Sequence, residues 1–253
     1  MRKWRDLVGW GSGARAVRRV SISTRHTSMT VDQPLSPSDP ALLSLLDGAI
    51  DAEGKIGRAL EALGPLSGRD VLLLDADRGV RRAQLEALGA RVQVPAADPE
   101  GGLRAAGLDG VPAESVDVVV AFWTGLGLGP VTEPIMVAAL ERVVRPGGRI
   151  LLVEVYGRDD TTGLFADPAR EARLVAANDR RGAMLAAGYR VRVLHCWWTF
   201  TDLDVMAAAL GALFPETGAA VAAAQRRPRL SFKVAVYHRT PEPDAPERPE
   251  VSP

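Results

Sequence analysis

The sequence predicts a doubly wound α/β domain built around a mostly parallel β-sheet. Apolar segments of strand length alternate along the chain with amphipathic segments of helix length, a pattern typical of right-handed βαβ units. Residues 117–123 (DVVVAFW) are apolar on both faces, as expected for a strand in the middle of a parallel sheet. Residues 131–156 predict a helix, a tight Pro-Gly-Gly turn and another fully buried strand in direct succession.

Each predicted element has local signals at its ends. Ser38 and Asp39 can cap the first helix, Pro40 suits its first turn, and Gly64-Pro65 ends it. Two later helices end on a glycine in the same way. The predicted strands cover 70–75, 90–94, 117–123, 149–156, 189–198 and 229–238. The predicted helices cover 40–63, 79–88, 132–144, 168–187, 202–213 and 215–226. A short helix and a weak strand are expected within 95–116.

The composition predicts one soluble domain. The length of 253 residues suits a single α/β domain with tails, and the 47% hydrophobic content supports a sizeable core. No uncharged apolar run reaches the roughly 18 residues of a membrane helix. The single cysteine, Cys196, allows no intrachain disulfide, so a reducing cytoplasm is expected. With one cysteine and three histidines, no metal cluster is expected. The abundance of arginine over lysine indicates a GC-rich bacterial genome.

Charge is unevenly spread along the chain. Residues 1–28 hold seven of the 31 basic residues and one of the 31 acidic residues, so the remainder is mildly acidic and a nucleic-acid partner is disfavoured. The basic head resembles a transit peptide in charge, or Met29 is the true start. We expect a disordered extension at 1–37, an α/β domain at 38–239, and a disordered tail rich in proline and acids at 240–253.

A ligand site is expected where the strands end. In open α/β sheets, ligands bind at the carboxyl ends of the strands, beside the switch in strand order. In this chain that edge corresponds to the loops after Leu74, Val94, Trp123 and Val155.

Four segments resemble the class I S-adenosylmethionine-dependent methyltransferases, in particular bacterial members. They are RVVRPGGRILLVE, AESVDVVVAFW, CWWTFTDLDVMAAAL and RLSFKVAVYHR, and the resemblance extends over about residues 40–238. It implies a Rossmann-like sheet of seven strands with an antiparallel last strand, S-adenosylmethionine as cofactor, and transfer of a methyl group to a small molecule.

The cofactor loop departs from this family. The family's acid falls on Leu73, and its first two glycines fall on Asp75 and Asp77, so that of the three glycines only Gly79 remains. Glycine lets the backbone approach a ligand closely, whereas aspartate adds bulk and negative charge. A second family acid falls on Ala96, with Asp98 two residues further on. The cofactor-binding residues that the resemblance implies are Asp75, Ala76, Asp77, Gly79, Asp98, Phe122 and Trp123.

These departures leave two functions open. Asp75 can replace the lost acid and hold the cofactor's ammonium group, which favours an active methyltransferase. Alternatively, Asp77 caps the following helix and occupies the amides that would bind the ligand, which favours a catalytically silent protein that acts by binding a partner protein. No residue is assigned as a catalytic base.

Other candidate residues follow the strands. Tyr156, Arg158 and Asp159 come directly after the strand at 149–156 and are candidates for the substrate pocket, and Trp123 is the aromatic residue most expected to line it. The arginines at 78, 81 and 82 are interpreted as a solvated helix face. No tyrosine is followed four residues later by lysine, which excludes a short-chain dehydrogenase.

Overall fold

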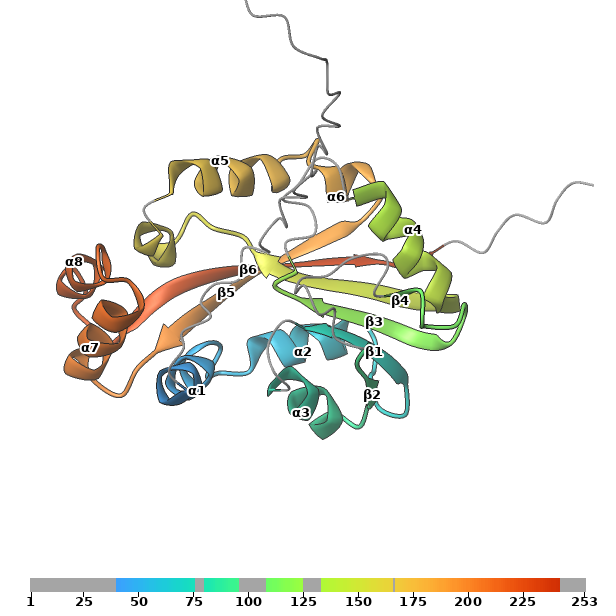
Figure 1. Ribbon diagram of the computed structural model, residues 1–253, viewed down its shortest axis with the longest axis horizontal. Coiled ribbons are helices and arrows are strands. Elements are labelled where there is room, and N and C mark those ends of the chain that lie inside the picture. The colour runs from blue at the N-terminus through green and yellow to red at the C-terminus, as the bar shows by residue number, and fades with distance from the viewer. Residues whose placement is uncertain (1–39, 76–79, 96–107, 125–132, 166, 242–253) are drawn as a thin grey trace, which may run out of the picture.

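The computed structural model describes residues 40–75, 80–95, 108–124, 133–165 and 167–241. Helices and strands alternate along this part of the chain (Figure 1). The helices are α1 (Pro40–Ala49), α2 (Lys55–Ala62), α3 (Val80–Ala87), α4 (Glu133–Val143), α5 (Pro168–Ala177), α6 (Ala183–Ala186), α7 (Leu203–Leu213) and α8 (Gly218–Ala223), with a 3₁₀ helix, η2 (Asp160–Leu164). The strands are β1 (Asp70–Asp75), β2 (Arg91–Gln93), β3 (Val116–Phe122), β4 (Val144–Val155), β5 (Arg190–Thr199) and β6 (Arg229–Arg239).

The described strands form one six-stranded sheet in the order β2-β1-β3-β4-β6-β5. Strands β1, β2, β3 and β4 pair in parallel, and the β1–β3 register runs from Val71 opposite Val118 to Asp75 opposite Phe122. The last strand, β6, is antiparallel to both β4 and β5. The predicted doubly wound, mostly parallel α/β fold with an antiparallel last strand is therefore confirmed.

The predicted seventh strand has no counterpart among the described residues. It was expected within 95–116, and most of that range, 96–107, lies outside the part of the chain that the structure describes. The expected extension at 1–37 and nearly all of the expected tail at 240–253 also lie outside it.

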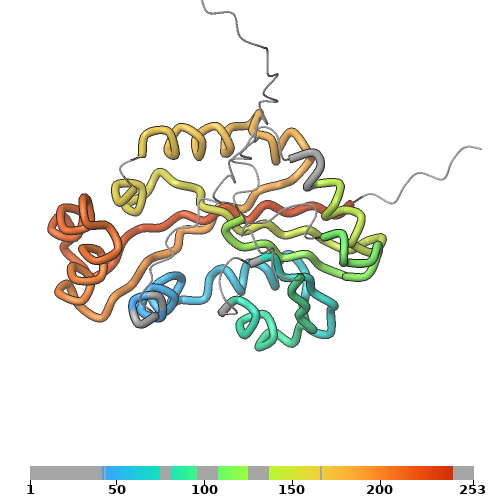
Figure 2. The backbone as a smooth tube through the Cα atoms, in the orientation of Figure 1, coloured from blue at the N-terminus to red at the C-terminus, as the bar shows by residue number. Residues whose placement is uncertain are grey.

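Helices cover both faces of the sheet (Figure 1). Helices α1, α2 and α3 lie on one face, α4, α5 and α6 lie on the other, and α7 and α8 pack together beside one end of β5 and β6 (Figures 1 and 2). Alternate residues of the central strands point to two separate buried clusters, as the period of two in a strand requires. Val118 and Val120 belong to one cluster, and Val119 and Ala121 to the other. The central strands are therefore buried on both faces, as predicted.

The predicted helix at 40–63 is two helices. The chain turns between α1 and α2, where Asp51 has a φ of 54° and Gly54 a φ of 65°. The Asp51 carboxylate accepts hydrogen bonds from the backbone N–H groups of Lys55 and Ile56 at 2.8 and 2.7 Å, so it caps the start of α2. The prediction of one continuous helix was wrong because Asp51 satisfies the first amides of a second helix.

The Pro-Gly-Gly turn lies within β4. Gly147 has a φ of 76°, a left-handed conformation that favours glycine. A Cβ atom on Gly148 would lie 2.6 Å from the carbonyl oxygen of Asp117 in β3, so a side chain there would separate the two strands.

In the described part of the chain, no helix is both long and apolar enough to span a membrane.

Candidate functional site

The candidate site lies at the carboxyl edge of the three central strands. Asp75 ends β1 opposite Phe122, which ends β3, and Phe122 in turn lies opposite Val153 of β4. The backbone at the end of β1 is therefore adjacent to the end of β3, as expected for a ligand edge in a parallel sheet. This edge is also where the described structure holds a strained tryptophan, a buried carboxylate and a buried guanidinium group.

The residue after β3, Trp123, has a φ of 53°, which is rare for a bulky side chain. Its backbone N–H donates to the carbonyl oxygen of Val153 at 2.9 Å, so neighbouring strand β4 holds the strained conformation. The Trp123 side chain is only 5% exposed, and its ring lies 6.3 Å from that of Phe122 and 5.7 Å from that of Phe232. The structure thus places the Trp123 ring inside the aromatic core, and its backbone at the ligand edge.

Glu154 is a buried carboxylate that the sequence analysis did not single out. It lies near the end of β4, is 5% exposed, and its Oε1 accepts hydrogen bonds from the Thr124 backbone N–H at 3.0 Å and the Thr124 hydroxyl at 2.7 Å. We call this pair the Glu154–Thr124 clamp. It fixes the direction in which the chain leaves β3. A signal was present in the sequence, because a charged residue inside the apolar run ILLVEV needs a buried partner.

A buried hydroxyl lies close to the clamp. Burial raises the pKa of the Tyr237 phenol, and the nearby charges of Glu154 and Tyr156 raise it further. The Tyr237 hydroxyl donates to the Asn178 side-chain carbonyl at 2.7 Å, and the Asn178 amide donates to the Tyr156 backbone carbonyl at 2.9 Å. Through these contacts α5 and its C-cap are tied to the end of β4.

Arg81 lies in the first turn of α3 and is 2% exposed. Its guanidinium carbon is 5.2 Å from the centre of the Phe122 ring, and its Nη1 donates to the Gln84 side chain at 2.9 Å. The neighbouring Arg82 is exposed and pairs with Glu86 at 2.8 Å. The interpretation of a solvated helix face is confirmed for Arg82 and is wrong for Arg81, because the helix turns Arg81 toward the end of β3. Arg78 lies outside the described residues.

The loop after β4 is held by local contacts. Asp159 caps η2, with Oδ1 accepting from the Thr161 hydroxyl at 2.6 Å and the Thr161 backbone N–H at 3.1 Å, while Oδ2 accepts from the Lys233 backbone N–H at 2.7 Å. Arg158 is exposed with a φ of 58°, and its carbonyl accepts from the Lys233 ammonium group at 2.7 Å. Tyr156 is half-buried and its backbone N–H donates to the Lys233 carbonyl. The structure therefore shows Asp159 using one carboxylate oxygen to cap η2 and the other to anchor the loop to β6.

Four of the cofactor-binding residues implied by the resemblance lie outside the described residues. They are Ala76, Asp77, Gly79 and Asp98. Of the remaining three, Asp75 is placed by its backbone at the end of β1, Phe122 ends the neighbouring strand β3, and Trp123 follows it. No group of three or more metal-ligating side chains occurs among the residues that the structure describes.

Comparisons with known proteins find similarity in solved structures alone. No family model matches the sequence, and the search of curated proteins finds no match. A SAM-dependent methyltransferase from Aquifex aeolicus is 15% identical and covers 81% of this chain and 100% of its own, with a TM-score of 0.42. The YcgJ protein from Bacillus subtilis is 12% identical over 76% of this chain and 99% of its own, with a TM-score of 0.45. A SAM-dependent methyltransferase from Archaeoglobus fulgidus is 11% identical over 74% and 93%, with a TM-score of 0.41.

Proposed function

We propose that this protein is an S-adenosylmethionine-dependent methyltransferase that acts on a small molecule. The strand order β2-β1-β3-β4-β6-β5, with β6 antiparallel, carries the proposal, because it is the arrangement that the sequence resemblance implies for the strands described. The carboxyl edge of β1, β3 and β4 then supplies the ligand site. A small acceptor is favoured because the body of the chain is mildly acidic, which disfavours nucleic acid.

We assign the cofactor's charged groups to residues at this edge. The methionine part of S-adenosylmethionine carries a carboxylate and an ammonium group. Arg81 supplies a buried positive charge beside the end of β3, where a carboxylate would be attracted in a low-dielectric setting. Asp75, at the end of β1, is the residue that we assign to the ammonium group. The remaining proposed cofactor residues are Ala76, Asp77, Gly79, Asp98, Phe122 and Trp123.

When bound, the cofactor supplies the methyl group from its sulfonium centre. The chain contributes mainly by holding donor and acceptor in line, since methyl transfer needs little acid or base catalysis. The Glu154–Thr124 clamp serves this role by fixing the backbone after β3. On the acceptor side we propose Tyr156, Arg158 and Asp159, with Asp159 acting through the loop that it anchors rather than through a free carboxylate oxygen.

The proposal extends to the organisation of the whole chain. Residues 38–239 form the catalytic domain of a bacterial, cytoplasmic enzyme, and 1–37 and 240–253 are a basic extension and an acidic, proline-rich tail. The second candidate is a catalytically silent protein with the same fold that binds a partner protein. It is favoured by Asp75, which lies where the resemblance expects a glycine.

A binding measurement separates the two candidates. We expect S-adenosylhomocysteine, titrated into the full-length protein by calorimetry, to bind saturably. It should stabilise the fold by about 2.7 kcal/mol at a hundredfold excess over Kd. Failure to bind at millimolar ligand would contradict the proposal and favour the silent protein.

Adjacent arginines provide a matched pair of variants. Arg81→Met should weaken binding about tenfold or more, because it removes the buried charge that we assign to the carboxylate. Arg82→Met removes an exposed charge from the same helix turn and should leave binding unchanged. Urea unfolding of each variant checks that the loss is not a loss of fold, and equal binding by both variants would refute the role of Arg81.

A further inference from the structure

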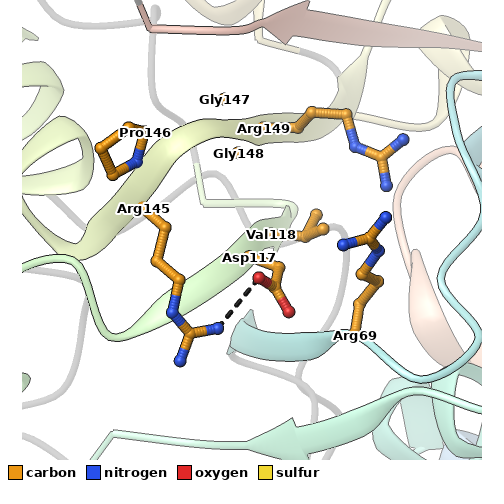
Figure 3. Close-up of a pocket in the computed structure, with 8 residues that line it drawn as sticks. All are labelled: Arg69, Asp117, Val118, Arg145, Pro146, Gly147, Gly148 and Arg149. Atoms are coloured by element: carbon orange, nitrogen blue, oxygen red, sulfur yellow. Dashed lines mark hydrogen bonds and ion pairs between the residues drawn. The ribbon is translucent and has the colours of Figure 1, made fainter. Parts of the chain in front are cut away.

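A second feature lies at the opposite edge of the sheet, where the parallel strands begin. A cleft of about 220 Å³ is lined by Arg69, Asp117, Val118, Arg145, Pro146, Gly147, Gly148 and Arg149 (Figure 3). We call it the arginine cleft. Three guanidinium groups and one carboxylate line it, so positive charge predominates. Its volume is below the roughly 300–1,000 Å³ of sites for drug-sized ligands, which suits a small ion or a single charged group.

The carboxylates near the cleft are already committed. Asp70 accepts from the Arg91 Nε at 2.7 Å and from the Arg145 Nη1 at 2.9 Å, and Asp117 accepts from the same Arg145 nitrogen at 2.9 Å. The other oxygen of Asp117 accepts from the backbone N–H of Asp70 at 2.8 Å. These two acids therefore balance the charges of Arg91 and Arg145, and neither is hydrogen-bonded to the other arginines of the cleft, Arg69 and Arg149.

Arg149 is held rigidly at the cleft. Its Nη1 and Nη2 donate to the backbone carbonyls of Leu63 and Pro65, both at 3.0 Å, and so cap the end of α2. The guanidinium group occupies the space that a Cβ atom on Gly64 would take. An arginine fixed by main-chain contacts loses little side-chain freedom when it binds a ligand.

Arg69 faces Arg149 with no compensating partner. Figure 3 shows the two guanidinium groups pointing toward one another. Within the described ranges, the Arg69 side chain makes no hydrogen bond or ion pair. Burial lowers the pKa of Arg149, and the charge of Arg69 lowers it further, against the opposite effects of Glu61 and Asp117. Two guanidinium groups that repel each other beside an open cleft are the arrangement that an anion would stabilise.

We propose that the arginine cleft binds a phosphate group between the guanidinium groups of Arg69 and Arg149. A phosphate dianion matches two positive charges, and its several oxygens suit the fork geometry of guanidinium groups. The group can come from free inorganic phosphate or from a phosphorylated small molecule. Because the cleft lies at the edge opposite the ligand site, this proposal does not depend on the methyltransferase activity.

The test is a titration of the full-length protein with inorganic phosphate and, separately, with glycerol 3-phosphate. Calorimetry and thermal unfolding are followed, with sodium chloride at matched ionic strength as the control. We expect saturable binding of at least one phosphate compound and none of chloride. Tighter binding of glycerol 3-phosphate would assign a phosphorylated small molecule as ligand, and tighter or equal binding of phosphate would assign the free ion. If neither compound exceeds chloride, the proposal is overturned.

Variants locate the binding. Arg69→Gln should weaken phosphate binding about tenfold or more while leaving the fold intact, since the Arg69 side chain has no described partner to lose. Arg190→Gln, which removes an exposed arginine from β5 at the far end of the strand order, should bind as the unmodified protein does. Arg149→Lys keeps the charge but loses the fork and should also weaken binding. Unchanged affinity in Arg69→Gln would place the phosphate elsewhere and overturn the proposal.

Discussion

Replacing Glu154 by alanine should destabilise the fold by about 3 kcal/mol or more. The change removes the shared acceptor of two buried hydrogen bonds and leaves the N–H and hydroxyl donors of Thr124 without that partner, at a cost of about 1–3 kcal/mol for each buried donor left unsatisfied. Glu154→Gln retains an oxygen at the same place and should cost about 1 kcal/mol.

The assay is urea unfolding followed by tryptophan fluorescence, with the free energy extrapolated to water at a constant m-value. Glu216→Ala is the control, since it removes an exposed acid and should change stability by less than about 0.5 kcal/mol. The same proteins are then titrated with S-adenosylhomocysteine, for which the alanine variant should lose more affinity than the glutamine variant. A cost below about 1 kcal/mol for alanine, or equal costs for alanine and glutamine, would refute the clamp.

Three further outcomes are expected. Hydrogen bonds from two arginines lower the Asp70 pKa from 3.8 to about 2, so the contribution of Asp70 to stability is present above pH ~3.8 and is lost as pH falls toward 2. Asp70→Asn should therefore flatten this part of a plot of urea midpoint against pH, and an unchanged plot would contradict the reasoning. Gly148→Ala should lower the free energy of unfolding in urea by about 1–3 kcal/mol, because the new Cβ would lie 2.6 Å from a carbonyl oxygen of β3. Gly211→Ala, in open space within a helix, should raise it by up to about 1 kcal/mol, and similar values for the two variants would contradict the explanation. The double variant Asp75→Gly with Asp77→Gly should gain S-adenosylhomocysteine affinity if the aspartates close the site, and lose it if Asp75 holds the ammonium group as we propose; calorimetry decides between them.

Local patterns predicted most of the fold. The apolar run at 117–123 predicted β3, and the apolar run after the Pro-Gly-Gly turn predicted the longer, second part of β4. Burial on both faces and a left-handed glycine are each visible in the local sequence. The break between α1 and α2 was missed. The apolar spacing continues through that segment, and the break depends on the Asp51 carboxylate reaching two amides four and five residues further on.

The candidate site was predictable in location but less so in its residues. The carboxyl ends of β1, β3 and β4 were expected from the βαβ pattern, and the register confirms that they are neighbours. Two buried charged residues distinguish this edge in the structure. Glu154 was not predicted from the sequence, and Arg81 was interpreted as solvated. Asp159 satisfies its carboxylate within its own loop and with β6, a contact between residues 74 positions apart that no local pattern reveals.

The sequence by itself determined the alternation of elements, the buried central strands and the edge at which a ligand would bind, because each of these follows from residue spacing within a segment. The tertiary structure alone decided which charges are buried and which are balanced. Arg81 and Arg82 are adjacent and chemically identical, yet one packs on Phe122 and the other pairs with Glu86 in solvent. The difference arises because desolvation and pairing depend on what other elements bring to within a few ångströms, a distance that the chain order does not encode.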